Sequence, residues 1–335
     1  MNDDFLSSLF LPALQKREQL IETLHAEQTT CYRLFHGTNE GCPGLTVDRY
    51  GDCLLVQTWR EPIETKLLET LQASVADATG LSLTPVWNHR AKRGSADHSL
   101  HPVELEDESK GLEFGLTYDT RPRHRGMDPL LFLDFQAARR HIKSFAAGKS
   151  VLNLFSYTCG AGMAAVAGDA KEVINVDFAQ SALEVGRSNY IANDLEDAFN
   201  AIHEDAIPIM LQYAGLGVRG RRQKRSFTAV EEKSFDLVIL DPPRYAKSHF
   251  GIVDTVGDYQ SLFKPALLST RPGGHMLVTN NVASVSRSDF ENMLTKCAAK
   301  AERPVSNLEF IDVEQDFPSP DGLWPLKMAW IELEA

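Results

Sequence analysis

The 335-residue sequence predicts an α/β fold, in which a mostly parallel sheet covered by helices on both faces follows a small α+β domain. From residue 151 onward, unbroken runs of Val, Ile and Leu alternate with helical segments, which is typical of buried parallel strands. Seven strands are predicted at 151–155, 172–176, 199–205, 235–240, 275–281, 308–314 and 326–333. No helix separates the last two, so the final strand must run antiparallel.

Composition indicates an ordinary globular protein, with 43% hydrophobic and 24% charged residues. The length favours two domains over a single core. The acidic N-terminus MNDDFLSSLF does not resemble a signal peptide and no apolar run could span a membrane, so we expect a cytoplasmic protein. Five cysteines form no pair or cluster at zinc spacing, and we therefore expect neither disulfides nor a metal. The net charge of −12 argues against non-specific coating of nucleic acid.

Three parts are expected along the chain. Residues 1–30 form a helical extension, residues 31–120 form the small α+β domain, and residues 121–335 form the main domain. In the small domain, glycine-rich turns bracket two strands in hairpin style. Residues 112–118 alternate apolar and polar side chains and predict a single strand.

The segment VLNLFSYTCGAG, residues 151–162, predicts a strand that ends in a glycine-bearing turn before a helix. In parallel sheets such a turn is a common place for a nucleotide-like ligand, although it can also be a plain connection. Asp177 ends the next strand, where a carboxylate can accept the hydroxyls of a ribose, and Phe178 can cover an adenine. Asp205 ends the third strand and can receive the adenine amino group. For both aspartates, a helix cap is the alternative interpretation.

The segment FDLVILDPPRY is the most specific feature of the sequence. A buried strand delivers Asp241, Pro242, Pro243 and Tyr245 to the carboxyl edge of the sheet. The prolines stiffen the backbone and remove two donors, so that carbonyl groups face the crevice. A carboxylate on this platform can orient a base and a nearby aromatic ring can stack on it, whereas a stiff turn without ligand is the alternative.

From about Arg33 to Ala335, the sequence resembles the ribosomal RNA large-subunit methyltransferases that use S-adenosylmethionine. The motifs that carry the resemblance are GCPGLTVDRYGD, LFLDFQAARR, VLNLFSYTCGAG, INVDFAQSALE, FDLVILDPPRYAKS and LVTNNVAS, in the order and spacing of that family. The resemblance implies a Rossmann-like class I methyltransferase fold, the cofactor S-adenosylmethionine and a nucleobase of ribosomal RNA as acceptor. Members of the family often pair, so a homodimer is an expectation as well.

The resemblance also implies the site residues. The implied cofactor-binding residues are Leu133, Asp134, Asn153, Phe155, Ser156, Thr158, Gly160, Gly162, Asp177, Phe178, Asp205, Ala206 and Asp241. The expected catalytic residues are Asp241, Pro242, Pro243, Tyr245 and Asn281, with no metal among them. The expected RNA contacts are Arg123, Arg125, Arg221, Arg222, Lys224, Arg225, Arg244 and Asn280. For the basic segments among these, solvated loops are the alternative.

Two departures from the family pattern bear on the chemistry. The sequence has no room for the N-terminal PUA-type RNA-binding domain that many members carry. Members that methylate cytosine C5 have a cysteine in the segment that here reads Thr279-Asn280-Asn281-Val282. Because C5 is a poor nucleophile, those enzymes add a thiolate to the base, whereas guanine N7 offers its own lone pair and needs only alignment.

We therefore predict methyl transfer to a ring nitrogen such as guanine N7, and we interpret Cys159 as a packing residue. The Asn-Asn pair resembles the guanine-N7 branch of the family. Three alternatives remain at this point: a nucleotide-dependent oxidoreductase, a methyltransferase with a non-RNA acceptor, and a non-catalytic S-adenosylmethionine-binding RNA-assembly factor.

Overall fold

The computed structural model describes residues 5–90, 109–122, 128–218 and 226–335. Their contacts form two compact units. Unit 1 comprises Met1–Gln136 and Glu314–Leu323, and unit 2 comprises Ala137–Val313 and Trp324–Ala335. None of the described helices has the length and apolar character that crossing a bilayer requires.

Unit 2 is built on the predicted seven-stranded sheet. Its strands are β7 (Ser150–Leu154), β8 (Glu172–Asp177), β9 (Ala201–His203), β10 (Phe235–Leu240), β13 (Thr270–Asn280), β14 (Val305–Ile311) and β15 (Lys327–Leu333). Their order is β14-β15-β13-β10-β7-β8-β9, and β15 is antiparallel to both of its neighbours. The predicted fold, with its reversed last strand, is therefore confirmed.

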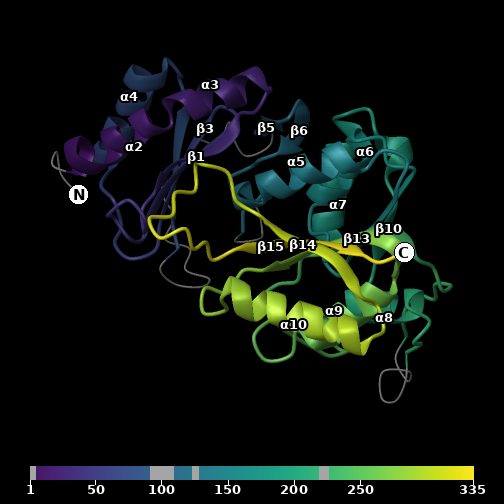
Figure 1. The fold of residues 1–335 in the computed structure, drawn as a ribbon. Coiled ribbons are helices and arrows are strands. Elements are labelled where there is room, and N and C mark those ends of the chain that lie inside the picture. Colours follow the sequence, from purple (N-terminus) through teal and green to yellow (C-terminus); the bar gives the residue numbers. More distant parts are fainter. Residues whose placement is uncertain (1–4, 91–108, 123–127, 219–225) are drawn as a thin grey trace. The chain divides into compact units, whose positions relative to one another are not determined.

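Helices cover both faces of this sheet (Figure 1). One layer contains α5 (Gln136–Phe145), α6 (Gly160–Ala167) and α7 (Gln180–Ile191), while the opposite layer contains α8 (Ala206–Tyr213), α9 (Gln260–Leu268) and α10 (Arg287–Lys300). A short turn of helix, η4 (Glu196–Ala198), precedes β9. Because both faces of β10 are covered, its consecutive residues from Leu237 to Leu240 are all fully buried, which explains the unbroken apolar run in the sequence.

A small hairpin follows β10 and was not predicted from the sequence. It consists of β11 (Tyr245–Lys247) and β12 (Ile252–Asp254), which pair antiparallel. The residues between the platform Asp241-Pro242-Pro243 and α9 thus form a defined element rather than a plain loop.

Unit 1 contains a four-stranded sheet of β1 (Cys31–His36), β2 (Leu45–Tyr50), β3 (Cys53–Thr58) and β4 (Thr84–His89). The helices of this unit are η1 (Leu6–Phe10), α2 (Leu11–Lys16), α3 (Glu18–Ala26) and α4 (Thr65–Thr79). The first three strands are antiparallel, and α4 is the crossover to the parallel strand β4. Phe10, Leu14 and Leu24 of the N-terminal helices join the same hydrophobic core as the strands. The N-terminal helices therefore share one core with the small α+β domain.

The prediction of a single strand at residues 112–118 is wrong. The structure has two strands there, β5 (Lys110–Glu113) and β6 (Leu116–Asp119), which form an antiparallel hairpin. The two turn residues, Phe114 and Gly115, have φ values of 51° and 79°. Two successive residues with positive φ are typical of a tight hairpin turn, and the apolar Phe114 concealed this turn within the alternating pattern.

A segment late in the sequence belongs to unit 1 rather than to the sheet of unit 2. Asp316 accepts a hydrogen bond from the Arg33 N–H at 2.8 Å through its carboxylate, and its backbone carbonyl accepts one from the Arg17 guanidinium at 2.9 Å. The Arg33 guanidinium lies 4.4 Å from the ring centroid of Phe317. Residues 314–323 thus belong to unit 1 together with its first segment, which ends at Gln136.

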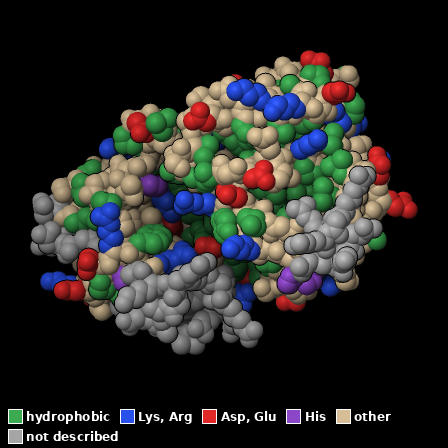
Figure 2. Space-filling view, turned by 90° about the horizontal axis from the view of Figure 1, so that it is seen from below, with side chains coloured by type: hydrophobic (Ala, Val, Ile, Leu, Met, Phe, Trp, Pro, Cys, Tyr) green, Lys and Arg blue, Asp and Glu red, His purple; other side chains and the backbone are tan. Residues whose placement is uncertain are grey.

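Charges of both signs are interspersed on the face drawn in Figure 2, where Lys and Arg side chains lie among Asp and Glu side chains. The net charge of −12 is therefore not a uniform acidic field over this face of the described residues.

Candidate active site

The turn between β7 and α6 has an unusual backbone. Phe155, Tyr157 and Cys159 have φ values of 58°, 48° and 60°, although none of them is glycine. Hydrogen bonds hold the turn, since the Ser156 N–H donates to the Val176 carbonyl at 3.0 Å and the Cys159 N–H donates to the Ser156 carbonyl at 2.7 Å. Left-handed non-glycine residues cost free energy and cluster at ligand sites, so this turn has the character of a binding loop.

The glycines have a different role from the one that the motif suggested. A Cβ atom at Gly162 would lie 2.1 Å from Oδ1 of Asn175, so only glycine lets α6 pack this closely on β8. Oδ1 of Asn175 also accepts a hydrogen bond from Nδ2 of Asn153 at 2.9 Å, and both asparagines are buried. Gly162 and Asn153 therefore position the turn from inside the fold.

Asp177 ends β8 and fastens the turn to the next helix. Its two oxygens accept hydrogen bonds from the Tyr157 N–H and from the Ala179 N–H, both at 2.8 Å. Burial raises the pKa of Asp177, although these backbone hydrogen bonds act in the opposite direction. A carboxylate has about four acceptor sites, so two remain for the hydroxyls of a ligand. The N-cap of α7 is Ala179 without a side-chain hydrogen bond, so Asp177 is not a helix cap, and its contact with a ribose stays a prediction.

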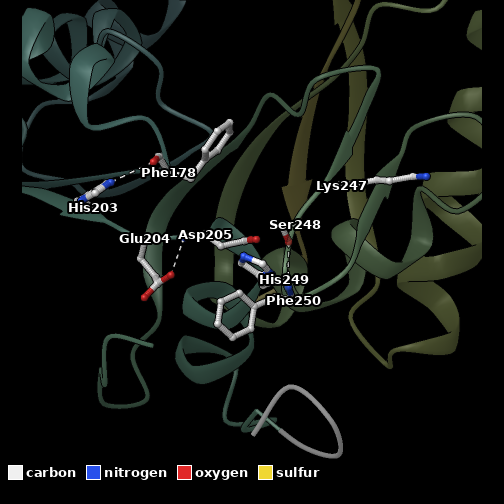
Figure 3. Close-up of a pocket in the computed structure, with 8 residues that line it drawn as sticks. All are labelled: Phe178, His203, Glu204, Asp205, Lys247, Ser248, His249 and Phe250. Carbon is white, nitrogen blue, oxygen red and sulfur yellow. Dashed lines mark hydrogen bonds between the residues drawn. The ribbon is translucent and has the colours of Figure 1, made fainter. Parts of the chain in front are cut away.

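A pocket of about 510 Å³ opens beside Asp177 at the carboxyl edge of the sheet. It is lined by Phe178, His203, Glu204, Asp205, Lys247, Ser248, His249 and Phe250 (Figure 3). Phe178 follows β8, His203 ends β9, and Glu204 and Asp205 come directly after it. Lys247 ends β11, and residues 248–250 belong to the turn of the β11–β12 hairpin. Phe178 is 63% exposed, so its ring is available to a flat ligand in this pocket.

The acidic end of the pocket is held by its own hydrogen bonds. Asp205 caps α8, since its Oδ1 accepts from the Ile207 N–H at 2.8 Å. Glu204 accepts from the Asp205 N–H at 2.9 Å, and Nε2 of His203 donates to the Phe178 carbonyl at 3.0 Å. Ala206, the first residue of α8, is buried, and its cofactor role stays a prediction.

Asp241 follows β10, which lies between β7 and β13 in the sheet. The hydroxyl of Thr279 in β13 donates to Oδ1 of Asp241, and the Thr279 carbonyl accepts from the Tyr259 hydroxyl at 2.6 Å. Burial raises the pKa of Tyr259 well above its ordinary value, so this phenol remains a donor. The carboxylate of Asp241 is therefore fixed in direction before any ligand binds.

The platform residues after Asp241 differ in their exposure to solvent. Pro242 is buried, whereas Pro243 and Arg244 are exposed and Tyr245 is 54% exposed. The Arg244 carbonyl accepts hydrogen bonds from the N–H and the hydroxyl of Thr255, at 3.2 and 3.1 Å. The Tyr245 ring is thus presented on a backbone that is fixed at both ends of the hairpin.

The two asparagines at the end of β13 have different environments. Asn280 is 2% exposed, its Nδ2 donates to the Thr255 carbonyl and its Oδ1 accepts from the Val282 N–H, both at 2.9 Å. The expected RNA contact by Asn280 is therefore corrected, because its amide is committed inside the fold. Asn281 is exposed at the same edge as Asp241.

The sequence pattern of one family, the S-adenosylmethionine-dependent methyltransferases, matches residues 32–329 of this chain. The chain belongs to this family. The protein is accordingly an S-adenosylmethionine-dependent methyltransferase, and the strained turn, Asp177 and the adjoining pocket fit that cofactor.

Individual relatives cover nearly the whole chain. Ribosomal RNA large subunit methyltransferase I of Aeromonas hydrophila is 28% identical over 336 residues, which cover 96% of this chain and 79% of that protein. The enzyme of the same name from Photobacterium profundum is also 28% identical and covers 97% of this chain and 78% of its own length. A solved methyltransferase structure complexed with SAH is 25% identical, has a TM-score of 0.79, and covers 99% of this chain and 82% of that one.

The cysteines of unit 2 do not resemble nucleophiles of a methyltransferase. Cys159 is fully buried and burial raises the pKa of its thiol to about 12. Burial also raises the pKa of Cys297, which lies in α10. The interpretation of Cys159 as a packing residue agrees with this environment.

The other predicted site residues belong to unit 1, to the turn after β7, or to segments outside the described residues. Leu133 and Asp134 belong to η3 (Leu133–Phe135) in unit 1, where Leu133 is buried, and their cofactor role stays a prediction. In the turn of the methyltransferase, Phe155 packs against the core, Ser156 and Thr158 are buried, and Gly160 begins α6. The predicted RNA contacts Arg123, Arg125, Arg221, Arg222, Lys224 and Arg225 lie outside the described residues.

Sequence reasoning missed three features of this methyltransferase site. Thr279, which donates to Asp241, lies in the motif LVTNNVAS, but the motif did not indicate this contact. His203 and the wall from Lys247 to Phe250 come from segments that meet only in the folded sheet. The strands Phe235–Leu240 and Ala201–His203 could have indicated this wall. Parallel strands bring their carboxyl ends to the same edge of a sheet, so the residues after both strands were candidates for one pocket.

Proposed function

We propose that this methyltransferase transfers the methyl group of S-adenosylmethionine to a nucleobase of RNA, with ribosomal RNA as the substrate. The observation that carries the proposal is the position of Asp241. Its strand β10 lies between β7, which leads into the cofactor turn, and β13, which Asn281 directly follows. A carboxylate held between donor and acceptor sides can orient a base toward a methyl group. The names of the relatives that span nearly the whole chain support RNA as the acceptor.

The cofactor supplies a methyl group on a positively charged sulfur. We assign Asp177 to the ribose hydroxyls, through the acceptor sites that its backbone hydrogen bonds leave available. Phe178 and Asp205 line the adjoining pocket, and we assign to it the adenine. We assign the rest of the cofactor to the backbone of the turn from Phe155 to Cys159, where three residues have positive φ.

We further propose a ring nitrogen, guanine N7, as the acceptor atom. Transfer to cytosine C5 requires a thiolate, and neither cysteine of unit 2 provides one, because burial raises the pKa of both Cys159 and Cys297. Guanine N7 has a lone pair in the plane of the ring, so alignment by Asp241, Tyr245 and Asn281 is sufficient.

Two further expectations stay predictions. One is the extent of the small domain, and the other is the homodimer that the resemblance implies. Sedimentation equilibrium tests the homodimer.

Substitution of Asp241 tests the catalytic proposal. We expect Asp241→Asn to lower methyl transfer to ribosomal RNA at least about a hundredfold, since the amide keeps the shape but loses the charge that orients the base. S-Adenosylmethionine affinity, measured by calorimetry, should change by less than about tenfold. Full transfer activity in the variant would contradict the proposal, and absence of transfer in the wild-type protein would favour a non-catalytic assembly factor or another acceptor.

A further inference from the structure

The β11–β12 hairpin has one outward face. Tyr245 pairs with Asp254, Ala246 with Val253, and Lys247 with Ile252. Because paired residues share a face and faces alternate along a strand, Tyr245, Lys247, Ile252 and Asp254 lie on one side. The other side packs inward, as the 4% exposure of Val253 shows. The hairpin therefore presents a small mixed surface, here called the hairpin face.

Apolar side chains on the hairpin face are unusually exposed. Tyr245 is 54% and Ile252 is 53% exposed, and Val256 just beyond the second strand is 55% exposed. Among the described residues of unit 2, the exposed large hydrophobic side chains are Phe178, Ile191, Tyr245, Ile252 and Val256. Three of these five fall within residues 245–256, and such clustering indicates a contact surface rather than scattered exposure.

The hairpin face is also held firmly beside the acceptor side of the site. Thr255 donates twice to the Arg244 carbonyl, and the Thr255 carbonyl accepts from Nδ2 of Asn280 at 2.9 Å. This chain of hydrogen bonds ties the base of the hairpin to the end of β13, where Asn281 follows. A partner that places a base near Asp241 would therefore meet the hairpin face next.

Two cations adjoin the aromatic ring of the hairpin face. Arg244 and Lys247 flank Tyr245 in the sequence, while Asp254 is the one carboxylate on the face. Nζ of Lys247 lies 5.8 Å from the ring centroid of Tyr245, so a cation adjoins an exposed aromatic ring. Asp254 turns its Oδ1 to the N–H groups of Val256 and Gly257, at 3.0 and 2.9 Å. Aromatic and apolar side chains next to a cation are the elements that bind single-stranded nucleic acid.

We propose that the hairpin face binds a single-stranded segment of RNA next to the target base. A neighbouring unstacked base lies on Tyr245 and Ile252, and a phosphate lies near Lys247. This inference rests on the proposed function and adds the surface that receives the flanking nucleotides. RNA binding at this face would explain why apolar side chains remain exposed there. The target base must be unstacked from its neighbours to reach the site, and the neighbouring bases then need a surface to contact.

The test compares Ile252→Ser with Ile191→Ser, a matched variant at the 48% exposed end of α7. Binding of a fluorescein-labelled single-stranded oligoribonucleotide of mixed sequence is titrated with saturating S-adenosylhomocysteine present. We expect Ile252→Ser to weaken binding about tenfold, as loss of one stacked base would, and Ile191→Ser to leave it unchanged. S-Adenosylmethionine affinity should equal that of the wild-type protein in both variants, which also shows that they fold.

A charge variant provides the second readout. Lys247→Gln should lower the slope of log affinity against log salt by about 0.7, because one phosphate contact of a single strand is lost. Lys300→Gln, at an exposed position of α10, is the matched control and should leave the slope unchanged. These titrations also use saturating S-adenosylhomocysteine, since Lys247 lines the cofactor pocket.

The outcomes separate this inference from the proposed function. If the wild-type protein methylates ribosomal RNA but both hairpin variants bind RNA normally, the hairpin face is not an RNA surface and the proposed function stands. If Ile252→Ser instead changes the oligomeric state in size-exclusion chromatography, the face is a self-association surface and the inference fails. If the wild-type protein neither binds nor methylates RNA, both proposals fail.

Discussion

Single residues in the turn after β7 carry the most information about the site. The sequence predicted a glycine-bearing turn here, and the structure gives positive φ to Phe155, Tyr157 and Cys159, none of which is glycine. Gly162 is required because a Cβ atom there would meet Oδ1 of Asn175 at 2.1 Å. The motif thus located the turn correctly, but sequence alone could not show this distribution, because it depends on how closely α6 approaches β8.

Cys159 gives a prediction at the same scale. Because its thiol is fully buried and burial raises its pKa to about 12, it has no thiolate to offer at neutral pH. We expect Cys159→Ala to keep methyl transfer within about threefold of wild type and to lower the free energy of unfolding by about 1 kcal/mol through lost packing. Transfer assays and urea unfolding measure both quantities. A loss of activity of about a hundredfold, with cofactor binding intact, would instead point to covalent catalysis by this cysteine.

At the scale of elements, long apolar strands were predictable and short polar hairpins were not. The run FDLVIL predicted β10 because a strand buried on both faces needs no polar residues. The absence of a helix before residues 327–333 predicted the reversed strand β15. The hairpins β5–β6 and β11–β12 were missed, because their strands have only three or four residues and their turns depend on local backbone angles.

The segment 314–323 provides a prediction about an element. Burial raises the pKa of Asp316 to about 7, although the Arg33 N–H and the charges of Arg33 and Arg17 act in the opposite direction. In the unfolded chain this carboxyl titrates at its ordinary value near 3.8, so between about pH 4 and pH 7 only the folded state holds the proton. Stability should therefore fall as the pH rises through this window, by at most about 1.4 kcal/mol per pH unit.

Asp316→Asn removes this titration and keeps an oxygen acceptor for the Arg33 N–H. We expect the free energy of unfolding of the wild type, relative to the variant, to decrease from pH 4 to pH 7 and to stay level above about pH 8. Urea unfolding of both proteins at several pH values measures this difference in the free energy of unfolding. Asp321→Asn, in the same segment but fully exposed, is the control and should show no such decrease. A pH-independent difference for Asp316→Asn would mean that this carboxyl is already ionised in the folded state.

At the scale of the whole molecule, the order of the elements was predictable from the sequence. The division of the chain into two compact units was harder to predict. Alternation of strands and helices determines the sheet of unit 2, and the order β14-β15-β13-β10-β7-β8-β9 follows from crossovers and one reversal. The return of residues 314–323 to unit 1 depends on long-range contacts of Arg17 and Arg33 with Asp316, which leave no local pattern in the sequence.

Contacts between distant segments also limited what the sequence could predict about the site. A recognisable strand led to Asp177, which ends β8, and to Phe178, which follows it, and their cofactor roles stay predictions. The pocket wall from Lys247 to Phe250 required the folded hairpin. Asn280 was assigned to RNA from its neighbour Asn281, and only its burial at 2% exposure showed that its amide serves the fold.

The central claim, methylation of an RNA base, is tested most directly in ribosomal RNA from cells with and without the gene. The purified RNA is digested to nucleosides, and the methylated nucleosides are compared by mass spectrometry. We predict the loss of 7-methylguanosine at one position, restored by the wild-type gene but not by the Asp241→Asn variant. Loss of 5-methylcytidine would contradict the ring-nitrogen proposal, and an unchanged set of methylated nucleosides would contradict ribosomal RNA as the substrate.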